Sequence, residues 1–152
     1  MENLTLKSKS LSQIALFLSL AAVVNAASPV TANGAPAASE TIAMHGLGGS
    51  GQNGTATITD RGGKVIVSVH IANEPASASE PSHVHFGKCP SIKAIPAYNV
   101  GPILNGEAKS VVALNWTMIN SGKYVVMVHK SSAAMGTYVS CANIGKLVPT
   151  NR

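Results

Sequence analysis

The feature that most constrains the fold is a series of short apolar runs, rich in β-branched residues, that recur at the spacing of short strands. Apolar and polar residues alternate in most runs, and no window shows the 3.6-residue period of an amphipathic helix. Clusters rich in Gly, Asn and Pro separate them, as in hairpins and crossovers. The runs are residues 41–45, 54–59, 64–71, 82–86, 108–114, 124–129 and 137–144. Seven or eight strands predict an all-β domain, a β-sandwich or a flattened Greek-key barrel.

Residues 90–102 form the longest stretch without strand character inside this series. The stretch contains Pro90, Pro96 and Pro102 and directly follows a cysteine. We interpret it as a surface loop that a disulfide holds at its start.

The first forty residues resemble an export signal followed by a spacer. Lys7 and Lys9 precede an apolar run over residues 11–24, and Val24-Asn25-Ala26 fits the small-x-small cleavage rule. The run is too short and too interrupted for the ~20 apolar residues of a permanent membrane anchor. We predict a signal peptide over residues 1–26, a flexible linker over 27–39 and one β domain over 40–152. An uncleaved tether or a buried helix is the alternative for the apolar run.

Charge and composition exclude several classes of function. Without residues 1–26 the chain keeps nine basic and five acidic residues, and the basic ones are scattered singly. Nucleic-acid binding would need clustered basic residues with aromatic residues between them, so it is not expected. Asp60 is the single aspartate, and no histidine accompanies a G-x-S-x-G motif, which argues against a hydrolase.

The chain has two cysteines, Cys89 and Cys141. In the oxidising environment that an exported protein meets, they predict one intramolecular disulfide. The alternative, a pair of thiolate metal ligands, fits less well because neither cysteine belongs to a C-x-x-C pair.

Three of the five histidines suggest a metal site. His83 and His85 stand two residues apart in an expected strand, so their side chains point to the same face. His129 ends another apolar strand, from which a third imidazole could reach them. Three histidines with an open position suit Cu(II) or Zn(II), while the lack of a neighbouring carboxylate argues against Mg, Ca or Mn. A bare H-x-H can also be structural, and its strand position and His129 are what favour a site.

The same residues resemble the copper-zinc superoxide dismutases. His83-Val-His85-Phe-Gly-Lys-Cys89 is similar to that family's metal strand, and Val126-Met-Val-His129-Lys130 to its later copper-histidine strand. Val139-Ser-Cys141-Ala-Asn-Ile-Gly145 is similar to its C-terminal cysteine strand. The resemblance implies an eight-stranded Greek-key β-barrel, one copper ion held by the three histidines, and pairing of the two cysteines.

The departures from that family concern zinc and substrate steering. The family's zinc loop carries histidines and an aspartate, but residues 90–102 contain no histidine and no acidic residue, so a zinc site is not expected. The family's active-site arginine lies three residues before the second cysteine, where this chain has Tyr138. The long electrostatic loop is shortened to residues 131–136. These differences put ordinary dismutation in question and leave a metal more open.

The remaining candidates are weaker. His45 and His70 match no ligand position of the family, and we interpret both as ordinary strand or surface histidines. Met127 is expected in the core, and Met135, in the loop after His129, is a candidate extra soft ligand for Cu(I).

Three hypotheses follow from the sequence. The first is an exported copper enzyme that dismutes superoxide or reacts with another small oxidant. The second is a non-catalytic protein that buffers or delivers copper outside the cytosol. The third is a metal-free module resembling chordin-type domains, which share the H-x-H strand and the later V-H strand but usually lack the cysteine pair. In all three the mature chain has no stable membrane anchor.

Overall fold

All seven apolar runs form strands in the structure, which is a computed structural model describing residues 37–145. The expected signal peptide lies outside the described residues, and so does most of the expected linker, although its last residue, Ser39, begins the first strand. The strands are β1 (Ser39–Gly46), β2 (Gly54–Asp60), β3 (Val65–Ile71), β4 (Glu80–Lys88), β5 (Ser91–Ile92), β6 (Tyr98–Ile103), β7 (Glu107–Val112), β8 (Tyr124–His129) and β9 (Tyr138–Ile144). Two short helices, α1 (Trp116–Ile119) and η1 (Ser132–Ala134), flank β8.

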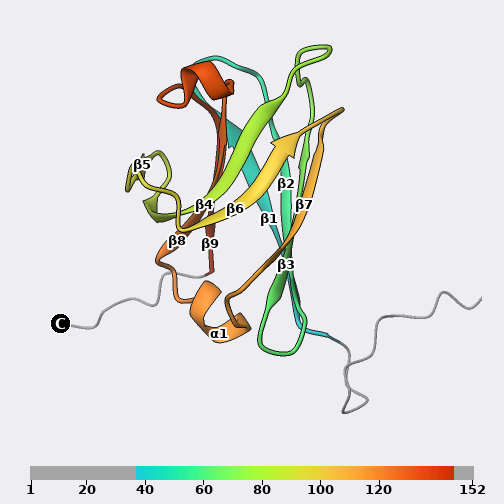
Figure 1. The fold of residues 1–152 in the computed structure, drawn as a ribbon, viewed down its shortest axis with the longest axis vertical. Helices are drawn as coiled ribbons and strands as arrows, with labels where there is room; N and C mark the ends of the chain where they lie inside the picture. Colours follow the sequence, from blue (N-terminus) through green and yellow to red (C-terminus); the bar gives the residue numbers. More distant parts are fainter. Residues whose placement is uncertain (1–36, 146–152) are drawn as a thin grey trace, which may run out of the picture.

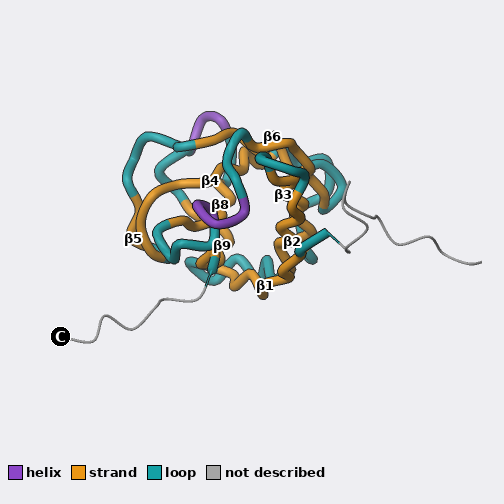
Figure 2. Tube along the Cα trace, turned by 90° about the horizontal axis from the view of Figure 1, so that it is seen from below, coloured by secondary structure: helices purple, strands orange, loops and turns teal. Residues whose placement is uncertain are grey.

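The strands form one curled antiparallel sheet (Figure 1). Its order is β5-β4-β8-β9-β1-β2-β3-β7, and β6 adds to β4. Seen from below, the sheet bends round until β6 comes beside β3 (Figure 2), and β6 also contacts β7. Within the described residues, β6 and β7 form no ladder, and one isolated bridge joins Leu104, directly after β6, to Glu107. The predicted all-β barrel-like fold is thereby confirmed.

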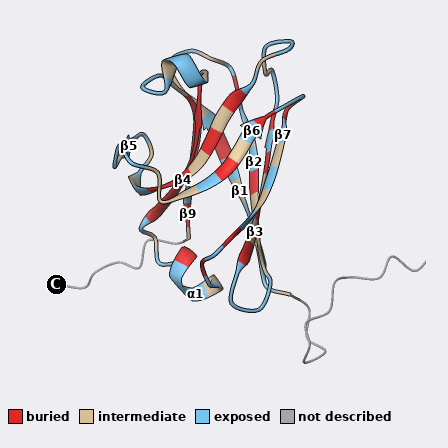
Figure 3. Ribbon diagram, in the orientation of Figure 1, coloured by how far each residue is buried: buried red, intermediate tan, exposed pale blue. Residues whose placement is uncertain are grey.

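The main core fills the inside of the curl. In β3 the pattern of buried and accessible residues alternates along the strand, so that Val65, Val67 and Val69 point inward. Ile58 of β2 and Val126 of β8 meet them from other parts of the sheet, and both are fully buried. Figure 3 shows the buried residues as red bands along the strands, for example on β4.

Strand β8 is buried on both faces. Val126 and Val128 face the main core, whereas Val125 and Met127 form a second apolar cluster on the outer face. Leu47, Cys89, Ile92 and Tyr138 cover this second cluster. The outer face of β8 is therefore dry, and His129 at its end is only 2% exposed.

The expectation of a strandless loop over residues 90–102 is wrong for part of its length. Strand β5 lies within it, and β6 begins at Tyr98, with Val100 and Ile103 in the core. Pro102 does not prevent the strand because β6 is laddered on one side only, where a proline is tolerated as on an edge. Gly101 adopts φ +111°, a conformation open to glycine.

The predicted disulfide is confirmed. It joins Cys89, just after β4, to Cys141 in β9 across a sequence separation of 52 residues, with the two Cα atoms 5.9 Å apart. The bond fixes the start of the β4–β6 connection against the outer cluster. No helix within residues 37–145 is long and apolar enough to cross a membrane.

Candidate metal centre

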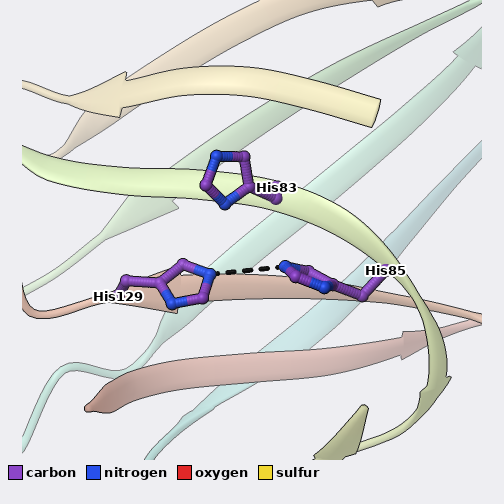
Figure 4. A group of neighbouring side chains, drawn as sticks. All are labelled: His83, His85 and His129. Atoms are coloured by element: carbon purple, nitrogen blue, oxygen red, sulfur yellow. Dashed lines mark hydrogen bonds between the residues drawn. The ribbon is translucent and has the colours of Figure 1, made fainter. Parts of the chain in front are cut away.

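The three predicted histidines come together on the outer face of the sheet (Figure 4). His83 and His85 lie on β4, and the β4–β8 pairing sets His83 opposite Met127 and His85 opposite Val125. His129 is two residues beyond Met127, so it shares the outer face with both. Register shifts occur between Ser82 and His83 and between Val128 and His129, and such irregularities re-aim side chains.

The three rings form a compact triangle. Their centroids are 5.6 Å apart for His83 and His85, 5.0 Å for His83 and His129, and 5.4 Å for His85 and His129. One ring nitrogen from each lies within 4.8 Å of the others, the arrangement that could hold a metal ion. His85 and His129 are buried, at 0% and 2% exposure, so the group is open to solvent through His83.

Backbone carbonyls fix the tautomers of the two buried rings. The Nδ1 of His85 lies 2.8 Å from the carbonyl oxygen of Lys93, and the Nδ1 of His129 is bonded to the carbonyl oxygen of Met135. A carbonyl oxygen can only accept, so each Nδ1 carries the hydrogen and, in a neutral ring, each Nε2 is left with a free lone pair. This is how metal-ligating histidines are oriented by their outer partners.

The two free nitrogens face one another. His85 Nε2 and His129 Nε2 are 3.3 Å apart, along the dashed line of Figure 4. With both Nδ1 atoms protonated, this contact becomes a hydrogen bond only if one ring takes up a further proton. Two lone pairs at this distance otherwise repel, and a cation between them removes the repulsion. The pair is thus arranged for a shared cation.

The spacing suits a metal of the size of copper or zinc. Two nitrogens each ~2.05 Å from one ion, at a tetrahedral angle, lie about 3.3 Å from each other. That is the distance found between the Nε2 atoms of His85 and His129. His83 offers a third donor, because its Nδ1 is buried and has no hydrogen-bond partner among the residues that the structure describes.

All three rings favour the neutral form that binds metal. Burial, with the charges of His129 and His85 added, lowers the pKa of His83 to about 4. Burial also lowers the pKa of His85 and of His129, although the hydrogen bonds to Lys93 and Met135 act in the opposite direction. Neutral imidazoles at neutral pH leave their lone pairs free for coordination without prior loss of a proton.

The turn after β4 brings the Lys93 carbonyl to His85. Gly87 pairs with Ile92 and Lys88 with Ser91, which folds β5 back along β4. Gly87 has φ +131°, and a Cβ placed there would lie 2.5 Å from the carbonyl oxygen of Ser91. The hairpin therefore requires glycine at this position.

The other candidates lie outside the triangle. His45 and His70 are exposed, and His70 approaches Glu107 at 3.8 Å. Met127 is fully buried in the outer cluster, as expected of a core residue. Met135 takes part in the site through its carbonyl oxygen, on His129. Sequence reasoning missed this carbonyl and that of Lys93, because a backbone acceptor leaves no trace in residue type.

Tyr138 is the aromatic neighbour of the site. Its ring meets that of His129 edge to face, with centroids 5.3 Å apart and planes at 74°. It covers one side of His129 and belongs to the outer apolar cluster.

Comparison with protein-family models and with curated proteins gives no match for this chain.

Proposed function

We propose that the protein is an exported, superoxide dismutase-like copper protein that dismutes superoxide at a zinc-free site formed by His83, His85 and His129. The observation that carries this proposal is the pair of unshared Nε2 lone pairs of His85 and His129, 3.3 Å apart. Hydrogen bonds from the Nδ1 atoms of both rings to backbone carbonyl oxygens hold these nitrogens in place. The resemblance in the order of the histidines and cysteines adds the reaction type.

Copper is favoured by the donor set. Three imidazoles with no carboxylate suit Cu or Zn, and Cu(II) is the divalent first-row ion that a nitrogen site of given geometry binds most tightly. When bound there, copper supplies one-electron redox chemistry through its two oxidation states. The overall reaction converts two superoxide ions and two protons into dioxygen and hydrogen peroxide.

The charge distribution supports an anionic substrate. From residue 81 to residue 145 the chain has one acidic residue, Glu107. Over the same stretch four exposed lysines lie on or beside the strands and turns that form the site: Lys88, Lys93, Lys123 and Lys130. A positive field of this kind raises the encounter rate of small anions, in a salt-dependent way. The lysines thereby supply part of the attraction for superoxide that the family's active-site arginine provides, at the position where this chain has Tyr138.

Access to the site supports a small substrate. His85 and His129 are buried, whereas His83 is partly exposed, so a reactant would approach on the side of His83. The role of the chain is to hold three neutral imidazoles in fixed tautomers and to leave one coordination position open.

Export is part of the proposal. The lysines, apolar run and small residues of positions 1–26 are typical of a signal peptide. The Cys89–Cys141 disulfide supports it, because such bonds persist outside the reducing cytosol.

The test is copper uptake by the mature protein. We expect one equivalent of copper in the wild-type protein and none in His129→Ala. His45→Ala is the matched control, because His45 is exposed and outside the triangle, and it should retain the full equivalent. Equal copper content in all three proteins would refute the site.

A second measurement decides the reaction. Copper-loaded wild-type protein should remove superoxide faster than a His83→Ala control loaded with the same amount of copper, and the difference should shrink as salt rises. One tightly bound copper with equal rates in both proteins would favour the second candidate, a copper-buffering protein. That candidate is favoured by one observation, the tyrosine at position 138. No copper uptake at all would leave the metal-free module.

A further inference from the structure

A second buried polar pair, which is not part of the group of three histidines, lies at one end of the barrel. Glu80 opens β4 and shares the alternation of Ser82 and Val84, whose side chains are buried on the side of the main core. Glu80 is 1% exposed, and Gln52, in the turn between β1 and β2, is 3% exposed. The Nε2 of Gln52 donates to the Oε1 of Glu80 at 2.8 Å. This contact joins the β1–β2 turn to the start of β4.

Each member of the pair has one oxygen without a partner. The Oε2 of Glu80 and the Oε1 of Gln52 are both buried and make no hydrogen bond to any residue between positions 37 and 145. An ionised carboxylate and an amide oxygen are both acceptors, so they cannot satisfy one another. Buried acceptors left in this state are costly. One proton on Oε2 would make Glu80 a donor, and a hydrogen bond from it to the Oε1 of Gln52 would give both oxygens a partner.

The charged groups around Glu80 do not supply an alternative partner. Glu74, before β4, carries the same charge, and no charged residue occurs in the turn of residues 47–53 or in β6. Exposed Lys130, after β8, and Tyr138 of β9 line the same cavity as Glu80, of about 250 Å³. Among the described residues the ion pair found is His70–Glu107, so Lys130 is not paired with Glu80.

We propose that Glu80 is a neutral carboxylic acid at neutral pH and forms a two-bond acid–amide pair with Gln52, which acts as a pH-sensitive latch at this end of the barrel. The amide N–H donates to Oε1 and the acid O–H donates to the amide oxygen. Loss of the proton breaks the second bond and leaves a buried charge beside Glu74. The β1–β2 turn then loosens from β4.

Electrostatics agree with this assignment. Burial is the largest influence and raises the pKa of Glu80, the Gln52 hydrogen bond lowers it, and the charge of Glu74 raises it again. A carboxyl whose pKa is raised by folding stabilises the native state fully below its unfolded pKa, near 4.3. That stability is lost as pH rises through the folded pKa, by up to about tenfold in the unfolding equilibrium per pH unit.

The test compares Glu80→Gln with the wild type in the metal-free protein. Glutamine keeps the shape and both hydrogen bonds, since its amide donates to Gln52 and accepts from it. We expect the wild type to lose denaturant resistance relative to Glu80→Gln as pH rises from 5 to 8. The difference between the two proteins cancels the contribution of the histidines. Glu40→Gln, which removes a carboxylate from β1, should show no such relative change.

Two further measurements complete the test. The Glu80 side-chain carboxyl carbon, followed by NMR in the wild type, should titrate above the range of ordinary carboxyl groups, and this readout does not depend on any variant. Amide exchange in residues 48–53 should accelerate with pH more in the wild type than in Glu80→Gln. A carboxyl that titrates in the ordinary range, or a Glu80→Gln protein that is less stable throughout, would overturn the proposal. The latter outcome would instead indicate an ionised Glu80 with a bound cation.

Discussion

Removing the disulfide should cost the domain a large part of its stability, and the structure gives the magnitude. Cys89 and Cys141 close a loop with a sequence separation of 52 residues. In the chain-entropy model, opening a loop of this length gives the unfolded chain about 14 cal/mol/K of entropy, or about 4 kcal/mol at 25 °C. Small domains have ~5–15 kcal/mol in total. The reduced protein should therefore be marginally folded at 37 °C.

The assay is urea unfolding of three samples: oxidised wild type, reduced wild type and the double variant Cys89→Ala/Cys141→Ala. Reduced wild type keeps both sulfur atoms and isolates the entropic part. The variant also loses sulfur at position 141, which is fully buried in the outer cluster. We expect it to lose ~1 kcal/mol more than the reduced protein, as for other small core deletions. Reductant should not change the variant.

The outcome that would refute this reasoning is a loss of less than about 1 kcal/mol in the reduced protein. Residual structure would then already limit the conformational freedom of residues 89–141 in the unfolded chain when the disulfide is reduced. A change in the slope of unfolding against urea would locate that confinement in the denatured state.

Two further predictions concern the metal centre. Gly87→Ala should lower copper affinity about 10–100-fold, the usual effect of losing an outer partner of a histidine ligand. The new Cβ would clash with the Ser91 carbonyl and displace Lys93. Gly136→Ala, where a Cβ would have no described atom within 4 Å, is the control, and competition with a chelator measures the copper affinity of both variants. Metal-free protein should become less stable as pH falls from 7 to 4, because folding lowers the pKa of His83 from 6.5 to about 4 and the unfolded chain takes up the proton first. Urea titrations of wild type and His83→Asn should show a smaller pH dependence in the variant, and an equal dependence in both would contradict the assignment.

The strands could be predicted from the sequence because their pattern is local. Short apolar runs, most of them alternating with polar residues and separated by glycine and asparagine at the turns, located all seven strands of this series. Strand β6 was missed because the prolines of residues 90–102, Pro102 among them, argue against a strand unless the strand is paired on one side only. Whether a strand is paired on one side or both depends on the topology of the whole sheet, so the local sequence of β6 cannot predict it.

The candidate site could be predicted only in part. The two-residue spacing of His83 and His85 fixes their common face, and His129 was found as the end of an apolar strand. What fixes the tautomers, the carbonyls of Lys93 and Met135, depends on how two loops fold back. The Gln52–Glu80 pair joins residues 28 positions apart, and each residue by itself resembles a surface side chain.

The residue pattern of the run from Tyr124 to His129 predicts burial of both faces of the strand, in addition to predicting the strand itself. Every residue before His129 in β8 is apolar, without the alternation of the other strands, and all six are buried. A continuous apolar strand is typical of one covered on both faces. A histidine ending such a strand must enter a dry environment, where burial lowers its pKa and the neutral ring needs a partner for each nitrogen. A protein carbonyl can satisfy the nitrogen that carries the hydrogen, and the other nitrogen, with its lone pair, is left for a cation.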